Sequence, residues 1–243
     1  MSQTSFIIHL ARATMRKSNV ERLAGTAPGD VCVVDAVDAE GLTGGVIAEW
    51  TGKTGRFPWY PFELRKSEIA CFLSHRKVWE MIVESGEPGA FVFEDGVVLD
   101  SAEFEKARGL VLRYAEPHHF IRFPCVRREA PGMVIASEQD THLFRPAVIG
   151  LGMQAQYVGR DAAARLLDTT RPFDRPVDTT LQMTWMTGQP AYSVWPSGVS
   201  EISSDIGGSM IGSRKSVFER GYRELARPLY RVALWLTSRS KEG

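Results

Sequence analysis

The sequence of 243 residues has few cysteines, no long apolar run and no net charge, and each shortage argues against a class of protein. Its three cysteines, Cys32, Cys71 and Cys125, form no CxxC pair, which argues against a structural zinc site. No window approaches the roughly 18 uninterrupted apolar residues of a membrane-spanning helix. Lys and Arg together number 29, as do Asp and Glu, so no overall positive charge marks a surface built for nucleic acid.

Two further signals are missing. The N-terminus lacks the basic start, apolar core and small-residue cleavage site of a secretory signal. No glycine-rich loop followed by lysine is present, which counts against a P-loop protein. The cysteines within apolar patterns are typical of buried free thiols in a reducing compartment. We therefore expect a cytoplasmic protein, free or peripheral on the inner membrane.

Short β-like runs alternate with helical patterns. The run "SFIIHL", a helix ending at Gly25 and the run "DVCVVDAVD" predict a β-α-β opening. This order favours an α/β fold of Rossmann type, with a mixed, mostly parallel sheet flanked by helices. Further strands are predicted in "HFIRF", "VIGLGMQAQYV" and "AYSVW", and a short helix in "RDAAARLLDTT".

The clearest helix is "SEIACFLSHRKVWEMIVES", with Ser67 as its predicted N-cap and Gly86 at its end. Before it, residues 38–66 are rich in glycine, proline and aromatic residues and are predicted to form a long irregular loop. Aromatic residues such as Trp59 and Tyr60 either fold this loop back on the body or stack on a sugar as a lid.

An apolar strand, "AFVFEDG", runs into Glu94 and Asp95. Ligands of open α/β sheets bind outside the carboxyl ends of the strands, so both acids are expected to project into such a crevice. There they can hold Mg²⁺ or Mn²⁺, or hydrogen-bond a ribose. The alternative is a pair of loop carboxylates in surface ion pairs.

The stretch "SEIACFLSHRKVWEMIVESGEPGAFVFEDGVVL" resembles the signature block of glycosyltransferase family 25, which includes bacterial lipopolysaccharide sugar transferases and collagen galactosyltransferases. The family pattern reads approximately G-E-I-G-C-x-L-S-H, then a Trp-containing helix, an aliphatic strand and E-D-D-V. The matching residues are Glu68, Ile69, Cys71, Leu73, Ser74, His75, Trp79, Glu94, Asp95 and Val97. The resemblance covers roughly residues 5 to 200 and is strongest in this block.

The resemblance implies a GT-A-type fold, a nucleotide diphosphate sugar donor, UDP-linked, and a carbohydrate or lipid-linked glycan acceptor. The implied reaction moves a hexose, galactose or a related sugar, to a lipopolysaccharide or another cell-surface glycan. Glu94 and Asp95 would meet the donor and its Mn²⁺ or Mg²⁺. Gly96 replaces the third acid of the motif, which leaves open whether Asp95 holds the metal, Asp178 assists, or cationic side chains neutralise the diphosphate instead. The same change supports a rival hypothesis, a non-catalytic glycan- or nucleotide-binding relative.

Further site residues are expected around the same crevice. Asp178 is a candidate acceptor-side base or metal partner by its place in the family order, and otherwise a surface acid. An arginine can clamp a diphosphate by two parallel hydrogen bonds, although those after the first strand could be a solvated helix start. Histidine beside an apolar stripe is more often a core residue than a ligand. The predicted donor-binding residues are His9, Arg12, Arg16, Asp35, Ser74, His75 and Arg76.

The C-terminal part differs in charge from the rest. Residues 214–243 hold eight Lys and Arg against three acids, whereas the preceding 213 residues are acidic. We predict a catalytic domain over residues 1–205 and a basic amphipathic helical tail over 206–243, interrupted or kinked at Pro228. The tail either docks on the body or lies on an anionic membrane surface through residues 214–239.

Overall fold

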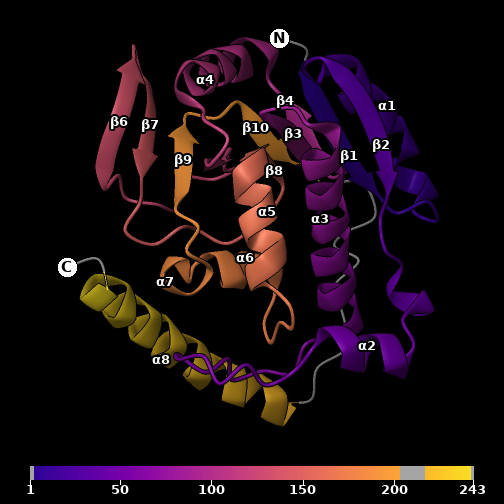
Figure 1. Ribbon diagram of the computed structural model, residues 1–243, viewed down its shortest axis with the longest axis vertical. Coiled ribbons are helices and arrows are strands. Elements are labelled where there is room, and N and C mark those ends of the chain that lie inside the picture. Colours follow the sequence, from indigo (N-terminus) through magenta and orange to yellow (C-terminus); the bar gives the residue numbers. More distant parts are fainter. Residues whose placement is uncertain (1–2, 203–216, 242–243) are drawn as a thin grey trace.

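The protein is described by a computed structural model that covers residues 3–202 and 217–241, in which an eight-stranded sheet forms the centre (Figure 1). The strand order is β2-β1-β3-β8-β5-β9-β7-β6. The strands span β1 Thr4–His9, β2 Asp30–Asp35, β3 Gly89–Glu94, β5 Phe120–Arg122, β6 Met133–Glu138, β7 Thr141–Arg145, β8 Ala155–Gly159 and β9 Ala191–Trp195. A separate two-stranded sheet pairs β4 Val97–Leu99 with β10 Val199–Glu201.

The large sheet is mixed, but six of its eight strands run in one direction. Strand β1 pairs in parallel with β2 and β3, and β5 pairs in parallel with β9. Strand β8 runs antiparallel between β3 and β5, and β7 runs antiparallel to β9 and β6. The predicted α/β class with a mostly parallel sheet is confirmed in this sense. The carboxyl ends of β1, β2 and β3 therefore meet at one edge of the sheet.

Helices cover both faces of this sheet. Helices α3 and α5 cover one face, and α1 and α4 cover the other. The described helices are α1 Lys17–Thr26, α2 Gly44–Trp50, α3 Lys66–Ser85, α4 Ser101–Tyr114, α5 Arg160–Thr169, α6 Val177–Leu181, α7 Thr184–Thr187 and α8 Val217–Lys241. Two short 3-10 turns, η1 Thr14–Arg16 and η2 Ala39–Gly41, complete the described elements. Figure 1 shows α3 and α5 side by side across the sheet, and α8 along the opposite edge of the molecule from α4.

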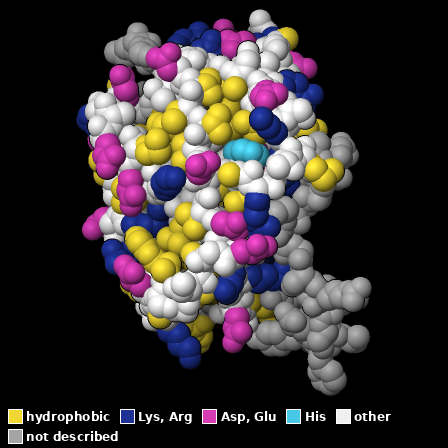
Figure 2. Space-filling view, turned by 90° about the vertical axis from the view of Figure 1, so that its right-hand side faces the viewer, with side chains coloured by type: hydrophobic (Ala, Val, Ile, Leu, Met, Phe, Trp, Pro, Cys, Tyr) yellow, Lys and Arg dark blue, Asp and Glu magenta, His cyan; other side chains and the backbone are white. Residues whose placement is uncertain are grey.

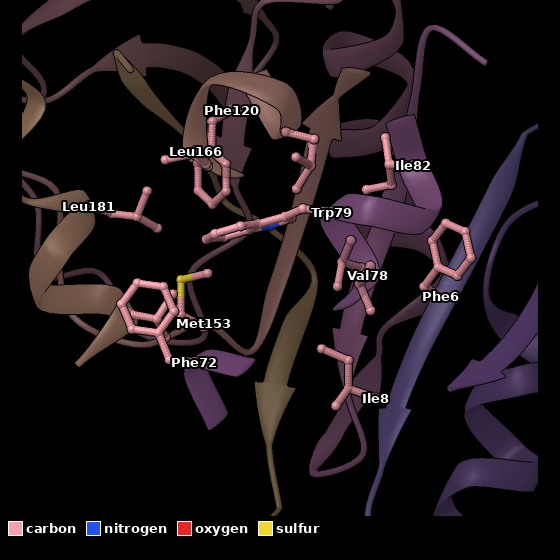
Figure 3. Close-up of a cluster of buried hydrophobic side chains, with 14 of the residues drawn as sticks. Phe6, Ile8, Phe72, Val78, Trp79, Ile82, Phe120, Met153, Leu166 and Leu181 are labelled. Atoms are coloured by element: carbon pink, nitrogen blue, oxygen red, sulfur yellow. The ribbon is translucent and has the colours of Figure 1, made fainter. Parts of the chain in front are cut away.

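Alternation along the strands divides the core into two layers. Phe6 and Ile8 of β1 pack with α3 residues such as Val78, as Figure 3 shows, whereas Ile7 packs on the other face with α1 and α4. Successive strand side chains point to opposite faces, so both faces of a central strand must be apolar when helices cover both. This explains why the strands appear in the sequence as continuous apolar runs.

The predicted central helix is confirmed as α3, which ends at Gly86 in the left-handed conformation with φ +72°. The predicted N-cap Ser67 is wrong, because the helix begins at Lys66 after an N-cap at Arg65. The side chain of Glu68 accepts a hydrogen bond from the Arg65 backbone N–H at 2.8 Å, which satisfies one donor at the helix start.

The prediction of an irregular loop over residues 38–66 is wrong in its first half, where η2 and α2 form. The side chains of Asp38 and Thr43 cap these elements by accepting hydrogen bonds from Glu40 and Val46 backbone N–H groups. Residues 52–65 are irregular, as predicted. Two glycines had obscured the helical pattern of "GGVIAEW".

The predicted tail helix is present as α8, with Pro228 inside it. The predicted domain boundary at residues 205–206 lies outside the described residues. Within the described ranges, each helix is too short or too polar to cross a membrane. On the right-hand side of the view in Figure 1, acidic and basic side chains are interspersed with apolar ones over the surface (Figure 2).

Candidate active site

A cavity of about 960 Å³ opens at the end of β3 and is bounded by α3, α6, the segment before β8, and α8. Its lining carries acidic and basic side chains in equal number among the described residues. The acidic ones are Glu68, Glu94, Asp178 and Glu201, and the basic ones are Arg16, Arg128, Arg227 and Arg231. A cavity of this size and mixed charge can accept a ligand with an anionic end and a polyhydroxylated end.

The two neighbouring acids of the "FEDG" motif point to different places. Along β3, Ala90 and Val92 face the layer of α3, whereas Phe91 and Phe93 face the layer of α1 and α4. Because strand side chains alternate, Glu94 continues the first set and Asp95 the second. Glu94 lines the cavity and keeps 32% of its side chain exposed, whereas Asp95 is buried.

Asp95 is surrounded by donors. Its Oδ2 lies 2.8 Å from His9 Nδ1, and its Oδ1 accepts a hydrogen bond from Arg16 Nη1 at 2.5 Å. The side chain of Asn19 donates to the Asp95 backbone carbonyl at 2.8 Å. These partners come from the end of β1, from η1 and from α1, so Asp95 connects the first three elements of the chain to β3. Three predicted site residues, His9, Arg16 and Asp95, are brought together here.

Glu94 lies against helix α3. His75 Nε2 is 3.1 Å from Glu94 Oε1, and the other ring nitrogen of His75 is 3.5 Å from Gln156 Nε2. Cys71, one turn before His75, places its sulfur 4.0 Å from the same carboxylate. Burial, with Glu94 and Asp178 nearby, raises the pKa of the Cys71 thiol well above its ordinary value. The thiol is therefore protonated at neutral pH.

The fit of this site to a divalent cation can be judged from its donor atoms. Among the described residues, the group of three potential ligands that converges is Cys71, His75 and Glu94, all within 4.8 Å of one another. Mn²⁺ and Mg²⁺ prefer about six oxygen ligands, and this group offers one carboxylate. Both carboxylate oxygens of Asp95 already bind His9 and Arg16. The described side chains therefore do not supply a ligand set suited to either ion at Asp95.

Asp178 reaches the cavity from the first turn of α6. Its Oδ2 accepts a hydrogen bond from the Gly152 backbone N–H at 3.0 Å, and its Oδ1 accepts one from the Thr179 N–H at 2.7 Å. Gly152 adopts φ +105°, a conformation that L side chains rarely adopt, so a glycine is required to present this N–H. The carboxylate is held in one orientation on the same cavity as Glu94.

Six of the seven predicted donor-binding residues do not line the cavity, since among them the lining contains Arg16 alone. His9 and His75 lie behind it, against Asp95 and Glu94, and the other four lie elsewhere. Arg12 pairs with Asp38 and Glu40 on the surface, and Asp35 is exposed at the end of β2. Ser74 is buried and accepts a hydrogen bond from the Val37 backbone N–H at 2.9 Å, which fixes the chain after β2. Arg76 donates to the Leu167 carbonyl at 3.0 Å and lies over the Trp50 ring, so it connects α3 to α5 and α2.

Sequence reasoning did not identify the opposite wall of the cavity. Arg227 and Arg231 of α8 line it, as do Tyr230 and Tyr60, whose rings lie 5.7 Å apart and nearly perpendicular. The predicted fold-back of the aromatic loop is seen at Tyr60. The amphipathic pattern predicted α8 itself, but spacing along a helix does not tell which of its faces meets the body.

Arg175 holds this wall in place. It is buried, and its guanidinium donates to the carbonyls of Arg56 and Pro58 at 3.2 and 3.0 Å and to the Tyr230 hydroxyl at 3.0 Å. Asp174 balances its charge at 2.6 Å. One side chain thus connects the irregular segment before α3, the start of α6 and the C-terminal helix. No sequence motif marked this residue, because most of its partners, such as Pro58 and Tyr230, lie far from it in the sequence.

Comparisons with known proteins identify the family that the central motif resembles. The model of the family described as "Glycosyltransferase family 25 (LPS biosynthesis protein)" matches residues 2–181. The chain is 34% identical over 97 residues to the "Probable inactive glycosyltransferase 25 family member 3" of Rattus norvegicus, a match covering 38% of this chain and 17% of that protein. It is 30% identical over 95 residues to "Procollagen galactosyltransferase 2" of Mus musculus, covering 38% of this chain and 15% of that protein.

Among solved structures, A197 from STIV aligns with 89% of this chain and 100% of its own, at a TM-score of 0.38 and 10% identity. The matches to the two curated relatives span less than a fifth of either protein's length. The family match, in contrast, covers most of the chain and contains both the "FEDG" strand end and Asp178. The chain is therefore a member of glycosyltransferase family 25.

Proposed function

We propose that this protein transfers a hexose, galactose or a related sugar, from a UDP-linked donor to a lipopolysaccharide or another cell-surface glycan. The reaction takes place in the cytoplasm, on a fold of GT-A type. The observation that carries the proposal is the shared cavity: Glu94 and Asp178, which are distant in sequence, line it together with Arg16, Arg227 and Arg231.

Each part of the reaction has a suitable group in the cavity. The acceptor oxygen forms a bond to the anomeric carbon, the bond from that carbon to the diphosphate breaks, and the acceptor proton must be taken up. We assign proton uptake to Asp178, whose two backbone hydrogen bonds fix it in position. Glu94, oriented by His75, binds hydroxyl groups of the donor.

The leaving diphosphate gains negative charge in the transition state, which cationic groups stabilise. We propose that Arg16 from the strand side and Arg227 and Arg231 from α8 carry this role. Arginine binds phosphate oxygens by paired hydrogen bonds and keeps its charge at every physiological pH. A dependence on Mn²⁺ or Mg²⁺ remains a prediction from the family resemblance, and the assay below includes it.

A second function, a non-catalytic relative that binds a nucleotide sugar or a glycan, has specific support. The rat relative is named probable inactive, and Gly96 stands where the family motif has a third acid. In addition, Asp95 is engaged by His9 and Arg16. The two functions share the cavity and differ in whether the donor is turned over.

The test combines binding and turnover. Thermal shifts are recorded with a panel of nucleotide sugars, with EDTA or with Mn²⁺, and UDP release is measured with a deacylated lipopolysaccharide core as acceptor. We expect a UDP-sugar to stabilise the protein, and Glu94→Gln and Asp178→Asn each to lower turnover by about 100-fold or more. Glu84→Gln, an exposed acid outside the cavity, is the matched control and should match the parent protein.

The outcomes separate the two functions. Turnover in either metal condition excludes the non-catalytic relative. Donor binding that needs Arg227 and Arg231 but yields no UDP with any acceptor supports that relative instead. If every donor left the melting temperature unchanged, both proposals for this cavity would fail.

A further inference from the structure

Helix α8 turns its apolar side away from the body. Leu229, Val232 and Leu236 are exposed by 72%, 56% and 56%. Their spacing of three and four residues places them on one stripe. Trp235, at the edge of this stripe, is 42% exposed and also lines the cavity. We call Leu229, Val232 and Leu236 the outer stripe. In the sequence the same apolar spacing extends back through Leu225 and Tyr222 to Phe218.

The opposite side of α8 binds the body. Leu234 and Ser238 are buried, and Tyr230 contacts Arg175 and Tyr60. The helix is therefore held on the body by this side, and its outer stripe stays exposed to solvent. An amphipathic helix that packs on its own domain normally buries its apolar side, so the reverse orientation indicates a second partner.

The charge of α8 distinguishes between the possible partners. Residues 217–241 contain six Lys and Arg against two acids. Two copies of this chain docked stripe to stripe would bring like charges together, whereas an anionic lipid surface is complementary to them. A helix is about 10 Å across, close to the Debye length at physiological salt, so arginines on its far side still feel the lipid charge. Trp235 is of the type found at membrane interfaces.

We propose that α8 lies in the headgroup region of an anionic phospholipid bilayer, with Leu229, Val232 and Leu236 among the upper acyl chains. Arg227 and Arg231 line the cavity from the same helix, so this docking places the cavity beside the lipid surface. A glycan carried on a lipid would then reach the cavity without leaving the membrane. The docking does not require the proposed function, because vesicle binding is measured without donor or acceptor.

The experiment measures co-sedimentation of the full chain with vesicles of phosphatidylcholine alone or mixed with phosphatidylglycerol. We expect binding to the mixed vesicles that weakens as salt is added. The triple variant Leu229→Ser, Val232→Ser, Leu236→Ser should bind at least about tenfold more weakly, since each apolar side chain buried in lipid contributes roughly 1 kcal/mol or more.

The matched control removes apolar side chains elsewhere. Met133, Val134 and Ile135 are exposed on β6, and their replacement by serine should leave vesicle binding unchanged. Circular dichroism melting checks that both triple variants are folded.

Four results would overturn the proposal. The parent protein could fail to sediment with mixed vesicles, or bind equally to neutral ones. The outer-stripe variant could bind as well as the parent. Finally, sedimentation equilibrium could show a dimer that the outer-stripe variant abolishes while vesicles bind neither protein, in which case a second copy covers the stripe. A glycosyltransferase assay that failed would leave these measurements intact.

Discussion

The two walls of the cavity are built in different ways. On one wall, β1 and β3 pair in register from Ser5 with Phe91 to Ile8 with Glu94, so backbone hydrogen bonds fix where each strand ends. On the other wall, α8 is attached through side chains, chiefly Tyr230, Leu234 and the guanidinium of Arg175. The first wall is therefore part of the cooperative core, whereas the second can come away while the sheet stays folded.

This difference assigns separate tasks to the walls. A carboxylate that takes part in bond breaking must be held within a fraction of an ångström, and the sheet edge holds Glu94 in this way. A wall of arginines on a less firmly attached helix can open to admit a large donor and close over its diphosphate. Substitutions that affect one wall alone test this difference between the walls.

The largest expected effect comes from Arg175→Ala. The change leaves Asp174 without its partner and removes the hydrogen bonds to Tyr230 and to the carbonyls of Arg56 and Pro58. Removing one partner of a buried ion pair lowers the free energy of unfolding by about 3–5 kcal/mol. We expect hydrogen exchange to accelerate in residues 51–65 and 226–238, while β1 and β3 stay protected.

The control for this prediction is Arg160→Ala, because Arg160 pairs with Asp161 on the surface. Loss of this ion pair should lower the free energy of unfolding by less than about 1 kcal/mol. Equal acceleration over the whole chain in Arg175→Ala would show that the two walls unfold as one unit, contrary to the comparison.

The next largest effect distinguishes the adjacent acids of the first wall. Asp95→Asn leaves Arg16 and His9 facing a neutral amide in a buried position, and we expect the free energy of unfolding in urea to fall by about 2–3 kcal/mol. Glu94→Gln should cost less than about 1 kcal/mol, because its carboxylate is partly exposed. Similar losses from both substitutions would contradict the different environments that we assign to them.

Local sequence patterns predicted the first wall well. Apolar runs located β1 and β3, the helical pattern that ends at Gly86 located α3, and the strand-end rule located Glu94. The pattern did not show that Asp95 turns inward, although strict alternation from Phe93 contains that information. Nor did it show that Arg76 crosses to α5, because the carbonyl that it meets belongs to a distant residue, Leu167.

The second wall could not be predicted in this way. Which face of α8 meets the body depends on the shape left by α6, α7 and the irregular segment, and this shape exists only after the sheet is formed. The hairpin of β6 and β7 was also missed, since "MVIASEQDTHLFR" lacks the Asn-Gly or Asp-Gly pair that marks the commonest hairpin turns. Long-range side-chain contacts, such as those of Arg175, leave no periodic trace in the sequence.

The smallest expected effect is a pH dependence confined to the α8 wall. Burial raises the pKa of Asp174, but hydrogen bonds from Arg175 and Thr54 outweigh it, so that the pKa lies below its ordinary value of 3.8. A carboxyl group with a lowered pKa in the folded state stabilises that state above its ordinary pKa and loses this contribution as the pH falls through the folded value.

Acidification below about pH 4 should therefore loosen α8 before the sheet unfolds. In the parent protein, the protection factors of residues 226–238, which correct for the pH dependence of intrinsic amide exchange, should fall in this range more than those of β1 and β3. Asp174→Asn should lower the protection factors of α8 at neutral pH and make them nearly independent of pH, whereas Asp161→Asn, an exposed control, should behave as the parent. If α8 and β3 lost protection together in the parent, the carboxylate would be stabilising the whole domain, and the second wall would not be a separate unit.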